Sequence, residues 1–274
     1  MRQQKITSTS QPASLSRTII NNPINSASFG DYSTLHVHFY DVGISALMEK
    51  GLSPMIKISK KIRLLDLGCG DGSVIFSLGK LGLLKNVCEV IGVDLSEQRI
   101  RRLLKELPFV TGIVSDASRI SGLPDGSVDF VICSQVIEHV NDDSALMLEI
   151  NRVMKEQRLV YLSSVVKKWY GVYLYYRNGS FRLDSTHLKE YSSLPEFKRL
   201  IEKQGFQVIA AQTNQMKFPI IDFVVRLLIK ARLLNPNVQF YQRNSIFQKL
   251  RKVRIPILGY SSAEVLAKKP VFKP

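Results

Sequence analysis

The chain has 274 residues, of which 45% are hydrophobic and 22% are charged, and these proportions exclude a disordered or fibrous protein. The formal net charge of +15 is unevenly distributed: residues 1–150 hold 15 Lys and Arg against 16 Asp and Glu, whereas residues 151–274 hold 23 against 7. A surface of one sign attracts anionic partners such as nucleic acid or acidic lipid headgroups, although a simple solubilising surface explains it equally well.

The chain opens with a polar arm over residues 1–33, rich in Ser, Thr, Asn and Gln, which we expect to be mobile. Helical spacing of apolar residues from Leu35 to Leu52 predicts a helix that leads into a core over 34–163. Within this core, short apolar runs predict the strands Ile62–Leu67, Glu89–Asp94, Val110–Val114, Val128–Cys133 and Leu159–Leu162. Helices are predicted at Ser73–Lys80, after the capping residue Ser96, and at Asp143–Met154. In the helix after Ser96, the residues expected on the solvent side are Arg99, Arg101, Arg102 and Lys105.

The alternation of strands and helices is interrupted twice after residue 163. Residues 164–193 form a basic stretch rich in aromatic side chains. We interpret the aromatic residues at 169–181 as a lid or a wall of the acceptor site, or else as a small core of the insertion itself. The core continues over 194–211, with a helix at Pro195–Lys203 and a strand at Gly205–Ala211. A second insertion, amphipathic and basic, covers 212–259, and residues 260–274 supply the last strand, Ala263–Ala267, and a tail. Such alternation predicts an α/β fold with a doubly wound, mostly parallel sheet.

The first predicted strand runs into a glycine loop, Gly68-Cys69-Gly70-Asp71-Gly72, ahead of a helix. Glycines let a ligand approach the backbone, and open parallel sheets bind ligands at the carboxyl ends of their strands. By itself the loop indicates only a nucleotide-like ligand. Asp66, just before it, would repel a pyrophosphate, and Ser73 stands where the dinucleotide fingerprint has its third glycine. An NAD enzyme is therefore disfavoured.

Two more acids follow predicted strands. Asp94, at the end of the second strand, is placed to accept hydrogen bonds from ribose hydroxyls, or else it is a favourable acid at the start of the next helix. Asp116, after the third strand, is placed to accept from an adenine amino group, or else it caps a helix before Ala117.

Together with the run from Asp129 to Val140, these motifs resemble those of class I S-adenosylmethionine (SAM)-dependent methyltransferases, and Glu138-His139-Val140 resembles the small-molecule group. The resemblance is strong over 62–163 and weaker at 195–211 and 261–269. It implies a seven-stranded Rossmann-like sheet with an antiparallel last strand, an inserted helical and aromatic cap, and SAM as cofactor. The residues that it implies for cofactor binding are Asp66, Gly68, Cys69, Gly70, Asp94, Leu95, Asp116, Ala117, Ser134 and Gln135. The family's Lys-Pro-Gly-Gly turn before strand five is here Lys155-Glu156-Gln157-Arg158, a departure that concerns the shape of that loop.

The catalytic candidates are His139, His187, Asp184 and Tyr191. His139 follows the fourth strand on the acceptor side and titrates near neutrality, so it is the leading general base, although a packed histidine is an equally good interpretation. The segment from Asp184 to His187 resembles one that borders the acceptor pocket in related enzymes, and it can equally be a capped helix start. If this segment is helical, His187 and Tyr191 share a face.

Three cysteines, Cys69, Cys88 and Cys133, form no C-x-x-C or Cys/His pattern. We therefore expect no disulfide framework and no metal, and we expect Cys133 to be a buried strand thiol rather than a nucleophile. Residues 1–16 lack the apolar core of a signal peptide, and no window of about 20 uncharged apolar residues is present. These features suit a cytoplasmic monomer or homodimer.

The segment Phe218–Leu234 is strongly amphipathic. Asp222, Arg226 and Lys230 recur every four residues as a polar stripe, which predicts an Asp222–Arg226 pair. The wide apolar remainder needs a partner: the flank of the domain, a second subunit or a membrane surface. Basic residues follow this segment up to residue 254. If the partner is a membrane surface, we therefore expect it to be acidic lipid at the inner membrane surface.

The motifs predict a SAM-dependent methyltransferase that acts on a small or lipid-linked acceptor. An RNA methyltransferase is an alternative, since the second half is basic, but no Asn-Pro-Pro-Tyr motif follows the fourth strand. A non-catalytic SAM-binding protein is a further alternative, against which the complete set of acids argues.

Overall fold

The computed structural model describes residues 20–21, 43–59, 61–173, 175–177, 179–184, 186–233 and 245–271. Apart from strand β1 (Ile20–Asn21), the expected polar arm lies outside the described residues, as does the first part of the helix predicted from Leu35. The described helix in this region is α2 (Ala46–Ile58), which begins after Ser45 because the Ser45 hydroxyl caps it by accepting a hydrogen bond from the Leu47 amide. It ends at Ile58, later than predicted.

The fold is built on a central sheet, whose strands lie in the order β1-β4-β3-β2-β5-β6-β10-β9. Its main strands are β2 (Ile62–Leu67), β3 (Val87–Asp94), β4 (Thr111–Val114), β5 (Val128–Ser134), β6 (Met154–Lys167), β9 (Gln207–Pro219) and β10 (Arg254–Lys268). Among the described strands of this sheet, β10 alone runs in the opposite direction to the others, and it pairs antiparallel with β6 and β9. The predicted seven-stranded, mostly parallel sheet with an antiparallel last strand is confirmed, and β1 adds a two-residue strand beside β4.

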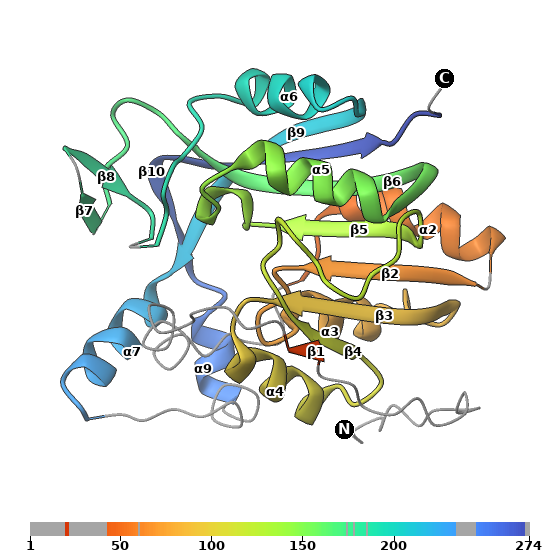
Figure 1. Ribbon diagram of the computed structural model, residues 1–274. Helices are drawn as coiled ribbons and strands as arrows, with labels where there is room; N and C mark the ends of the chain where they lie inside the picture. Colours follow the sequence, from red (N-terminus) through yellow and green to blue (C-terminus); the bar gives the residue numbers. More distant parts are fainter. Residues whose placement is uncertain are drawn as a thin grey trace.

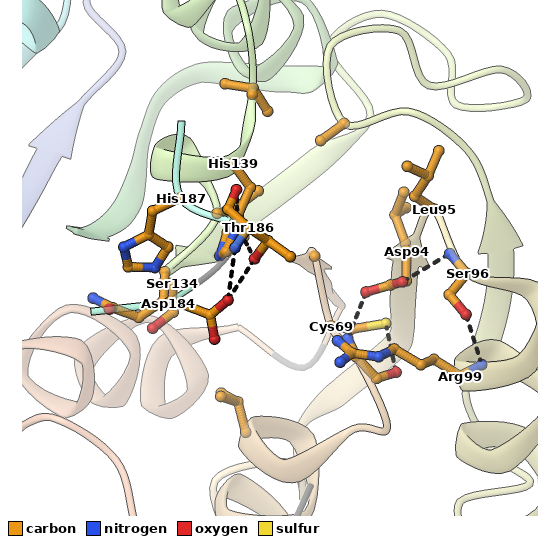
Figure 2. Close-up of a pocket in the computed structure, with 18 of the residues that line it drawn as sticks. Cys69, Asp94, Leu95, Ser96, Arg99, Ser134, His139, Asp184, Thr186 and His187 are labelled. Atoms are coloured by element: carbon orange, nitrogen blue, oxygen red, sulfur yellow. Dashed lines mark hydrogen bonds between the residues drawn. The ribbon is translucent and has the colours of Figure 1, made fainter. Parts of the chain in front are cut away.

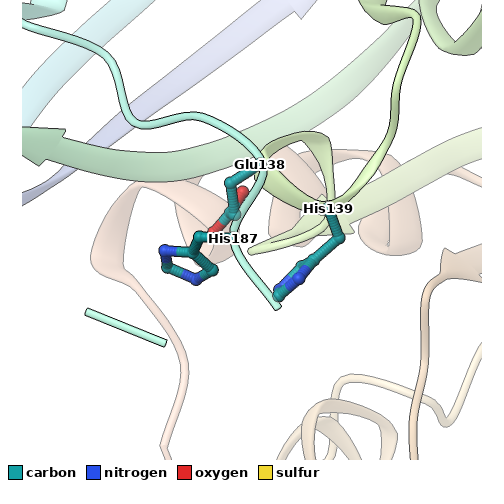
Figure 3. A group of neighbouring side chains, drawn as sticks. All are labelled: Glu138, His139 and His187. Carbon is teal, nitrogen blue, oxygen red and sulfur yellow. The ribbon is translucent and has the colours of Figure 1, made fainter. Parts of the chain in front are cut away.

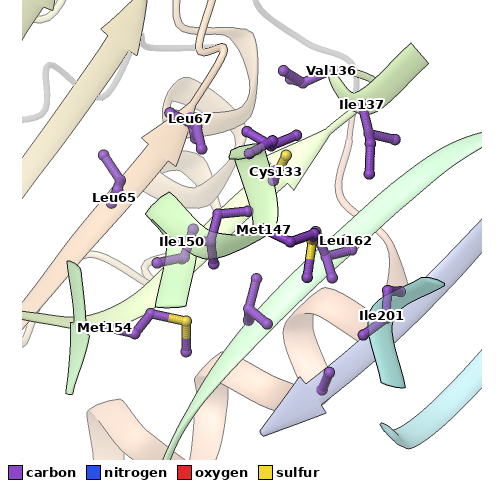
Figure 4. Close-up of a cluster of buried hydrophobic side chains, with 14 of the residues drawn as sticks. Leu65, Leu67, Cys133, Val136, Ile137, Met147, Ile150, Met154, Leu162 and Ile201 are labelled. Carbon is purple, nitrogen blue, oxygen red and sulfur yellow. The ribbon is translucent and has the colours of Figure 1, made fainter. Parts of the chain in front are cut away.

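Helices cover both faces of this sheet (Figure 1). The helices α5 (Asp143–Val153) and α6 (Leu194–Lys203) pack on one face, where they bury a large apolar cluster with Leu65, Val131 and Leu162 (Figure 4). The helices α2, α3 (Ser73–Lys80) and α4 (Glu97–Glu106) pack on the other face. This two-sided cover explains why the central strands read as continuous apolar runs in the sequence.

Three predicted elements were shorter than the strands that form. Strand β6 continues to Lys167, strand β9 continues to Pro219, and strand β10 begins at Arg254. Within the predicted insertion at 212–259, the described residues that lie outside the sheet are therefore 220–233 and 245–253. They hold α7 (Ile220–Lys230) and α9 (Ser245–Leu250).

Both insertions project from the edge of the sheet where the parallel strands end (Figure 1). The first insertion holds a small hairpin of β7 (Tyr175–Arg177) and β8 (Ser180–Arg182). None of the helices in the described ranges combines the length and the apolar character that a membrane span requires.

Candidate active site

A cavity of about 710 Å³ lies at the carboxyl ends of the parallel strands. The loops that follow β2, β3, β4 and β5 form one part of its wall, and segments from both insertions form the rest. Figure 2 shows Cys69, Asp94 and Arg99 on one side of the cavity and His139, Thr186 and His187 on the other. The two sides can therefore hold two different groups at once.

The glycine loop needs its glycines for conformation and for packing. Gly68, Gly70 and Gly72 all have positive φ, at 72°, 55° and 89°. A Cβ atom at Gly68 would lie 2.3 Å from Cγ2 of Val136, and one at Gly72 would lie 2.3 Å from a methyl carbon of Leu103. The loop is therefore held in a shape that exposes its backbone to the cavity.

Asp94 joins the glycine loop to the start of α4. Its Oδ2 accepts a hydrogen bond from the Gly70 amide at 2.9 Å, and its Oδ1 accepts one from the Ser96 amide at 2.9 Å. Burial raises the pKa of this carboxyl, and the Arg99 guanidinium opposes that shift. Arg99 lines the cavity, so its predicted place on the solvent side of α4 was wrong.

Asp66 is almost completely buried on β2, just before the loop, and its Oδ2 has no hydrogen-bond partner among the described residues. Burial and the neighbouring Asp94 raise its pKa to about 7. A buried carboxylate without a partner is unfavourable, so this position favours a cationic group nearby.

The other residues expected on the cofactor side all line the cavity: Gly68, Cys69, Gly70, Asp94, Leu95, Asp116, Ala117, Ser134 and Gln135. Asp66 is the exception, since it lies behind the wall rather than in it. No helix follows Asp116, where the chain makes a turn closed by the Ser118 amide on Oδ1 at 2.7 Å. The alternative of a helix cap at this position is therefore wrong.

His139, on the short helix η2 (Ile137–His139), belongs to a hydrogen-bonded chain. The Thr186 hydroxyl donates to Oδ1 of Asp184 at 2.8 Å and lies 3.0 Å from Nδ1 of His139. The Thr186 hydroxyl has a single proton, which it donates to Asp184. We therefore assign the proton of the hydrogen bond between Thr186 and His139 to Nδ1 of His139. Burial and the neighbouring His187 lower the pKa of His139 to about 4, so the ring is neutral and Nε2 holds a lone pair.

His187 and Glu138 lie beside this chain (Figure 3). The His187 ring stands edge-on to His139 with 4.8 Å between centroids, and its Nδ1 is 2.9 Å from Oε1 of Glu190. Glu138 is fully buried, accepts from the Ser164 hydroxyl at 2.9 Å, and has its pKa raised to about 7 by burial. Glu138, His139 and His187 each offer a possible ligand atom, and these atoms lie within 4.8 Å of one another, so the group can hold a cation. No pattern in the sequence predicted this group.

Tyr191 does not join these residues. The segment from Asp184 to Tyr191 is not helical, so the condition for a shared face with His187 fails. The Tyr191 hydroxyl donates to Asp143 at 3.0 Å, its ring packs on Phe197, and it does not line the cavity. Cys133 is fully buried in β5, as expected.

Another part of the cavity wall is apolar and is formed by Tyr173, Leu183, Met216, Phe218 and Ile257, although Asn141, Asp142 and Lys217 also line the cavity. Of the aromatic residues at 169–181, Tyr173 fulfils the expectation of a wall, whereas Trp169 is 93% exposed. Met216 and Phe218 were not predicted to line the site. Their spacing of two residues is typical of one face of a strand, but the polar residues around them made the strand hard to recognise in the sequence.

The amphipathic segment forms a helix, α7, as predicted, and Asp222 on this helix makes an ion pair with α9 that was not predicted. Asp222 binds Arg251 of α9 through two hydrogen bonds, at 2.9 Å and 3.0 Å. The side chain of Arg226 lies outside the described residues.

A family model described as "Methyltransferase domain" matches residues 40–211. A ubiquinone biosynthesis O-methyltransferase of Neisseria meningitidis is 31% identical over 110 residues, which cover 38% of this chain and 44% of that protein. The chain thus spans less than half the length of the curated relatives that it matches.

Solved structures share the fold. Phosphoethanolamine N-methyltransferase 2 of Haemonchus contortus, in complex with S-adenosyl-L-methionine, has a TM-score of 0.54 at 19% identity, over 88% of this chain and 57% of that chain. The cyclase SpnF has a TM-score of 0.60 at 16% identity, over 93% of this chain and 100% of that chain. Since a cyclase shares it, the fold alone does not fix the reaction.

Proposed function

The chain belongs to the methyltransferase-domain family, and from that premise we propose that it transfers a methyl group from SAM to a small or lipid-linked acceptor. One observation supports this proposal above the others. The cavity that holds the glycine loop, Asp94 and Asp116 on one side holds His139 on the other, so donor and acceptor sites form one space.

The donor side fits SAM in shape and charge. The glycine loop presents backbone to the methionine part, Asp94 keeps lone pairs for the ribose hydroxyls, and Asp116 with Ala117 lies where adenine would sit. The unpartnered Oδ2 of Asp66 suits a ligand that bears ammonium and sulfonium charges. When bound, SAM supplies an electrophilic methyl group on sulfur. The Asp66 carboxylate also disfavours a dinucleotide, because it would oppose the negative charge of the pyrophosphate.

The acceptor side supplies a base held in one tautomer. Asp184 orients the Thr186 hydroxyl, and that hydroxyl fixes Nδ1–H of His139, so Nε2 is left to accept a proton from an acceptor hydroxyl. We propose His139 as the base, with Asp184 as a positioning residue and His187 as a second polar contact to the acceptor.

The acceptor is proposed to be apolar with a hydroxyl group, for example a hydroxylated ring on a lipid tail. The apolar wall of Tyr173, Met216, Phe218 and Ile257 excludes water around the acceptor and holds it for in-line attack. The similarity to O-methyltransferases of ubiquinone biosynthesis supports a hydroxyl as the methylated group.

Ligand binding tests the donor site first. We expect SAM and S-adenosylhomocysteine to raise the melting temperature and NAD to leave it unchanged. Asp94→Ala should weaken SAM binding at least tenfold in calorimetry, because hydrogen bonds to a charged group contribute about 1.5–3 kcal/mol each. Glu106→Ala, on the exposed side of α4, is the matched control. Stabilisation by NAD alone, or unchanged SAM affinity of Asp94→Ala, would contradict the proposal.

Transfer of tritiated methyl groups into fractionated extracts tests the reaction. We expect label in the lipid or small-molecule fraction. Label in RNA instead would favour the alternative that uses the basic second half. SAM binding without label in any fraction would favour a non-catalytic SAM-binding protein.

A further inference from the structure

Two neighbouring groups of large apolar side chains are exposed at the edge of the sheet that holds the cavity. The first group lies in the loop after β6, and the second lies on α7, α9 and the start of β10. Together we call them the apolar face: Trp169, Tyr170, Val172, Ile220, Val224, Leu227, Leu228, Ile246, Leu250, Val253, Ile255 and Leu258. Exposed apolar surface of this extent is typical of an interaction site.

The two groups meet along β10. The Lys168 amide donates to the Gly259 carbonyl at 2.8 Å, and a Cβ atom at Gly259 would lie 2.5 Å from Cα of Gly171. This close approach places the loop with Trp169 directly beside Leu258, which is 70% exposed. Further along the same strand, Arg254 pairs with Pro219, and the Ile220 amide donates to the Val253 carbonyl. The face is therefore continuous from the aromatic loop to the start of α7.

The helical part of the face is fixed in position rather than loosely attached. Val225 and Phe247 are buried, whereas Val224, Leu227 and Leu228 point outward. The paired hydrogen bonds of Asp222 with Arg251 join α7 to α9. A hairpin with a packed inner side and an apolar outer side presents that outer side to a partner.

The charge around the face identifies the partner. Residues 212–259 contain nine Lys and Arg and a single acid, Asp222, which is already paired with Arg251. Lys168, Lys249, Lys252 and Arg254 are exposed beside the apolar side chains. Cations attract both RNA and anionic lipid, but of these two partners only a lipid layer also takes up aliphatic side chains. A tryptophan at the border of such a layer is also favourable.

We propose that the apolar face docks on an anionic lipid bilayer. Met216, Phe218 and Ile257 line the cavity from the two strands that lead into this face, and along β10 the buried Ile257 is followed by the exposed Leu258. Docking thus brings the acceptor side of the cavity close to the lipid. Only the corollary, that the acceptor is drawn from the bilayer, rests on the proposed function.

Trp169 is the single tryptophan of the chain, so its fluorescence reports on the face directly. We expect the full chain, without methyl donor, to float with vesicles of phosphatidylcholine and phosphatidylglycerol and not with phosphatidylcholine alone. The emission of Trp169 should shift to the blue and be quenched by brominated lipid. Because no methyl transfer is measured, this result is independent of the proposed reaction.

Matched variants locate the contact. Leu227→Ser with Leu258→Ser should weaken vesicle binding at least tenfold, whereas Leu148→Ser with Ile209→Ser, equally exposed on α5 and β9, should not. Lys249→Gln with Lys252→Gln should weaken it by roughly fivefold for each lysine, and Lys57→Gln with Lys105→Gln should leave it unchanged. Circular dichroism and SAM affinity should stay those of the wild type in all four.

Three outcomes would overturn the proposal. The first is the absence of binding to anionic vesicles, or binding without a change in Trp169 emission. The second is equal loss in the test and control variants. The third is a Trp169 shift that depends on protein concentration rather than on lipid, which would mean that a second copy covers the face. Tight RNA binding without vesicle binding would be a case of the first outcome, with RNA as the partner.

Discussion

Asp66 combines a functional position with an unfavourable environment. Its pKa is raised from 3.8 to about 7, so the folded protein favours the neutral form and loses stability as pH rises from about 4 to 7. Asp66→Asn removes that penalty. We expect the variant, without ligand, to be more stable than the wild type at pH 8, by up to about 4 kcal/mol, and similar to it at pH 4. Urea unfolding at both pH values measures this.

The same carboxyl predicts how SAM affinity depends on pH. Ionised Asp66 attracts the positive charges of SAM, so the wild-type affinity should fall as pH drops below 7. Asp66→Asn should bind SAM weakly at every pH and show a flatter pH profile in calorimetry. Reduced stability of the variant at pH 8 together with unchanged SAM binding would show that Asp66 is merely a structural residue.

His139 should not behave as an ordinary histidine in the rate profile. Because its pKa is lowered to about 4, it stays neutral from pH 5 to 8. At saturating SAM, kcat should therefore show no loss of activity through His139 protonation near pH 6.5. His139→Gln should lower kcat by about 10²–10⁴-fold without changing SAM affinity. A wild-type acid limb near 6.5 that vanishes in this variant would contradict the assigned pKa.

Gln157 sits where the resembled family has a glycine, and its φ of 61° is left-handed. The position is fixed because its amide donates to the Lys269 carbonyl at 2.9 Å. Left-handed conformation costs an ordinary residue about 1–2 kcal/mol, so Gln157→Gly should stabilise the protein by up to about 1 kcal/mol after the entropy of glycine is included. Gln98→Gly, in the exposed part of α4, should destabilise it by a similar amount. Thermal unfolding of both variants tests the sign.

At the scale of elements, the sequence predicts the buried strands well and the exposed ones poorly. The runs at Ile62–Leu67 and Val128–Cys133 are mostly apolar, with Arg63, Asp66 and Asp129 as the exceptions, because helices cover both faces of the sheet, so the strand pattern is clear. The second half of β9 is mostly exposed and polar, and pairing with β10 rather than its composition makes it a strand. The contact of His139 with Thr186 could not be predicted from the sequence either, because it joins residues that are 47 positions apart in the chain.

The ion pair between Asp222 and Arg251 links two helices, α7 and α9, rather than two turns of one helix. Asp222 is nearly buried and receives two hydrogen bonds from Arg251. Asp222→Ala leaves that guanidinium without its partner carboxylate and should destabilise the hairpin by about 2–4 kcal/mol. We expect faster amide exchange in α7 and α9, with the central strands unaffected.

At the scale of the whole molecule, the donor and acceptor sides are built from different parts of the chain. Residues up to Gln135 supply the donor side, and the later segments supply most of the acceptor wall. The motifs for the donor side are local, since strand, loop and acid follow one another in sequence. The acceptor wall joins Tyr173, Met216 and Ile257, which no local pattern connects. A sequence of this kind therefore predicts its cofactor far better than its acceptor.

This division predicts that the α7–α9 hairpin can be removed. Pro219 and Arg254 are partners in the β9–β10 ladder, so residues 220–253 leave and return at one point. An Asn-Gly turn in their place would close the two strands as an ordinary hairpin. Met216, Phe218 and Ile257 remain, as does every residue of the donor side. We expect the shortened chain to fold and to bind SAM with unchanged affinity in calorimetry.

The shortened chain should lose at least tenfold in affinity for anionic vesicles, because it lacks most of the apolar face and most of the surrounding cations. Residual vesicle binding should then depend on Trp169 and its neighbours, and Trp169→Ser in the shortened chain should abolish it. Weakened SAM binding would instead mean that the hairpin supports the donor side across the cavity. Such a result would mean that the donor side and the acceptor side depend on each other, although they are built from different parts of the chain.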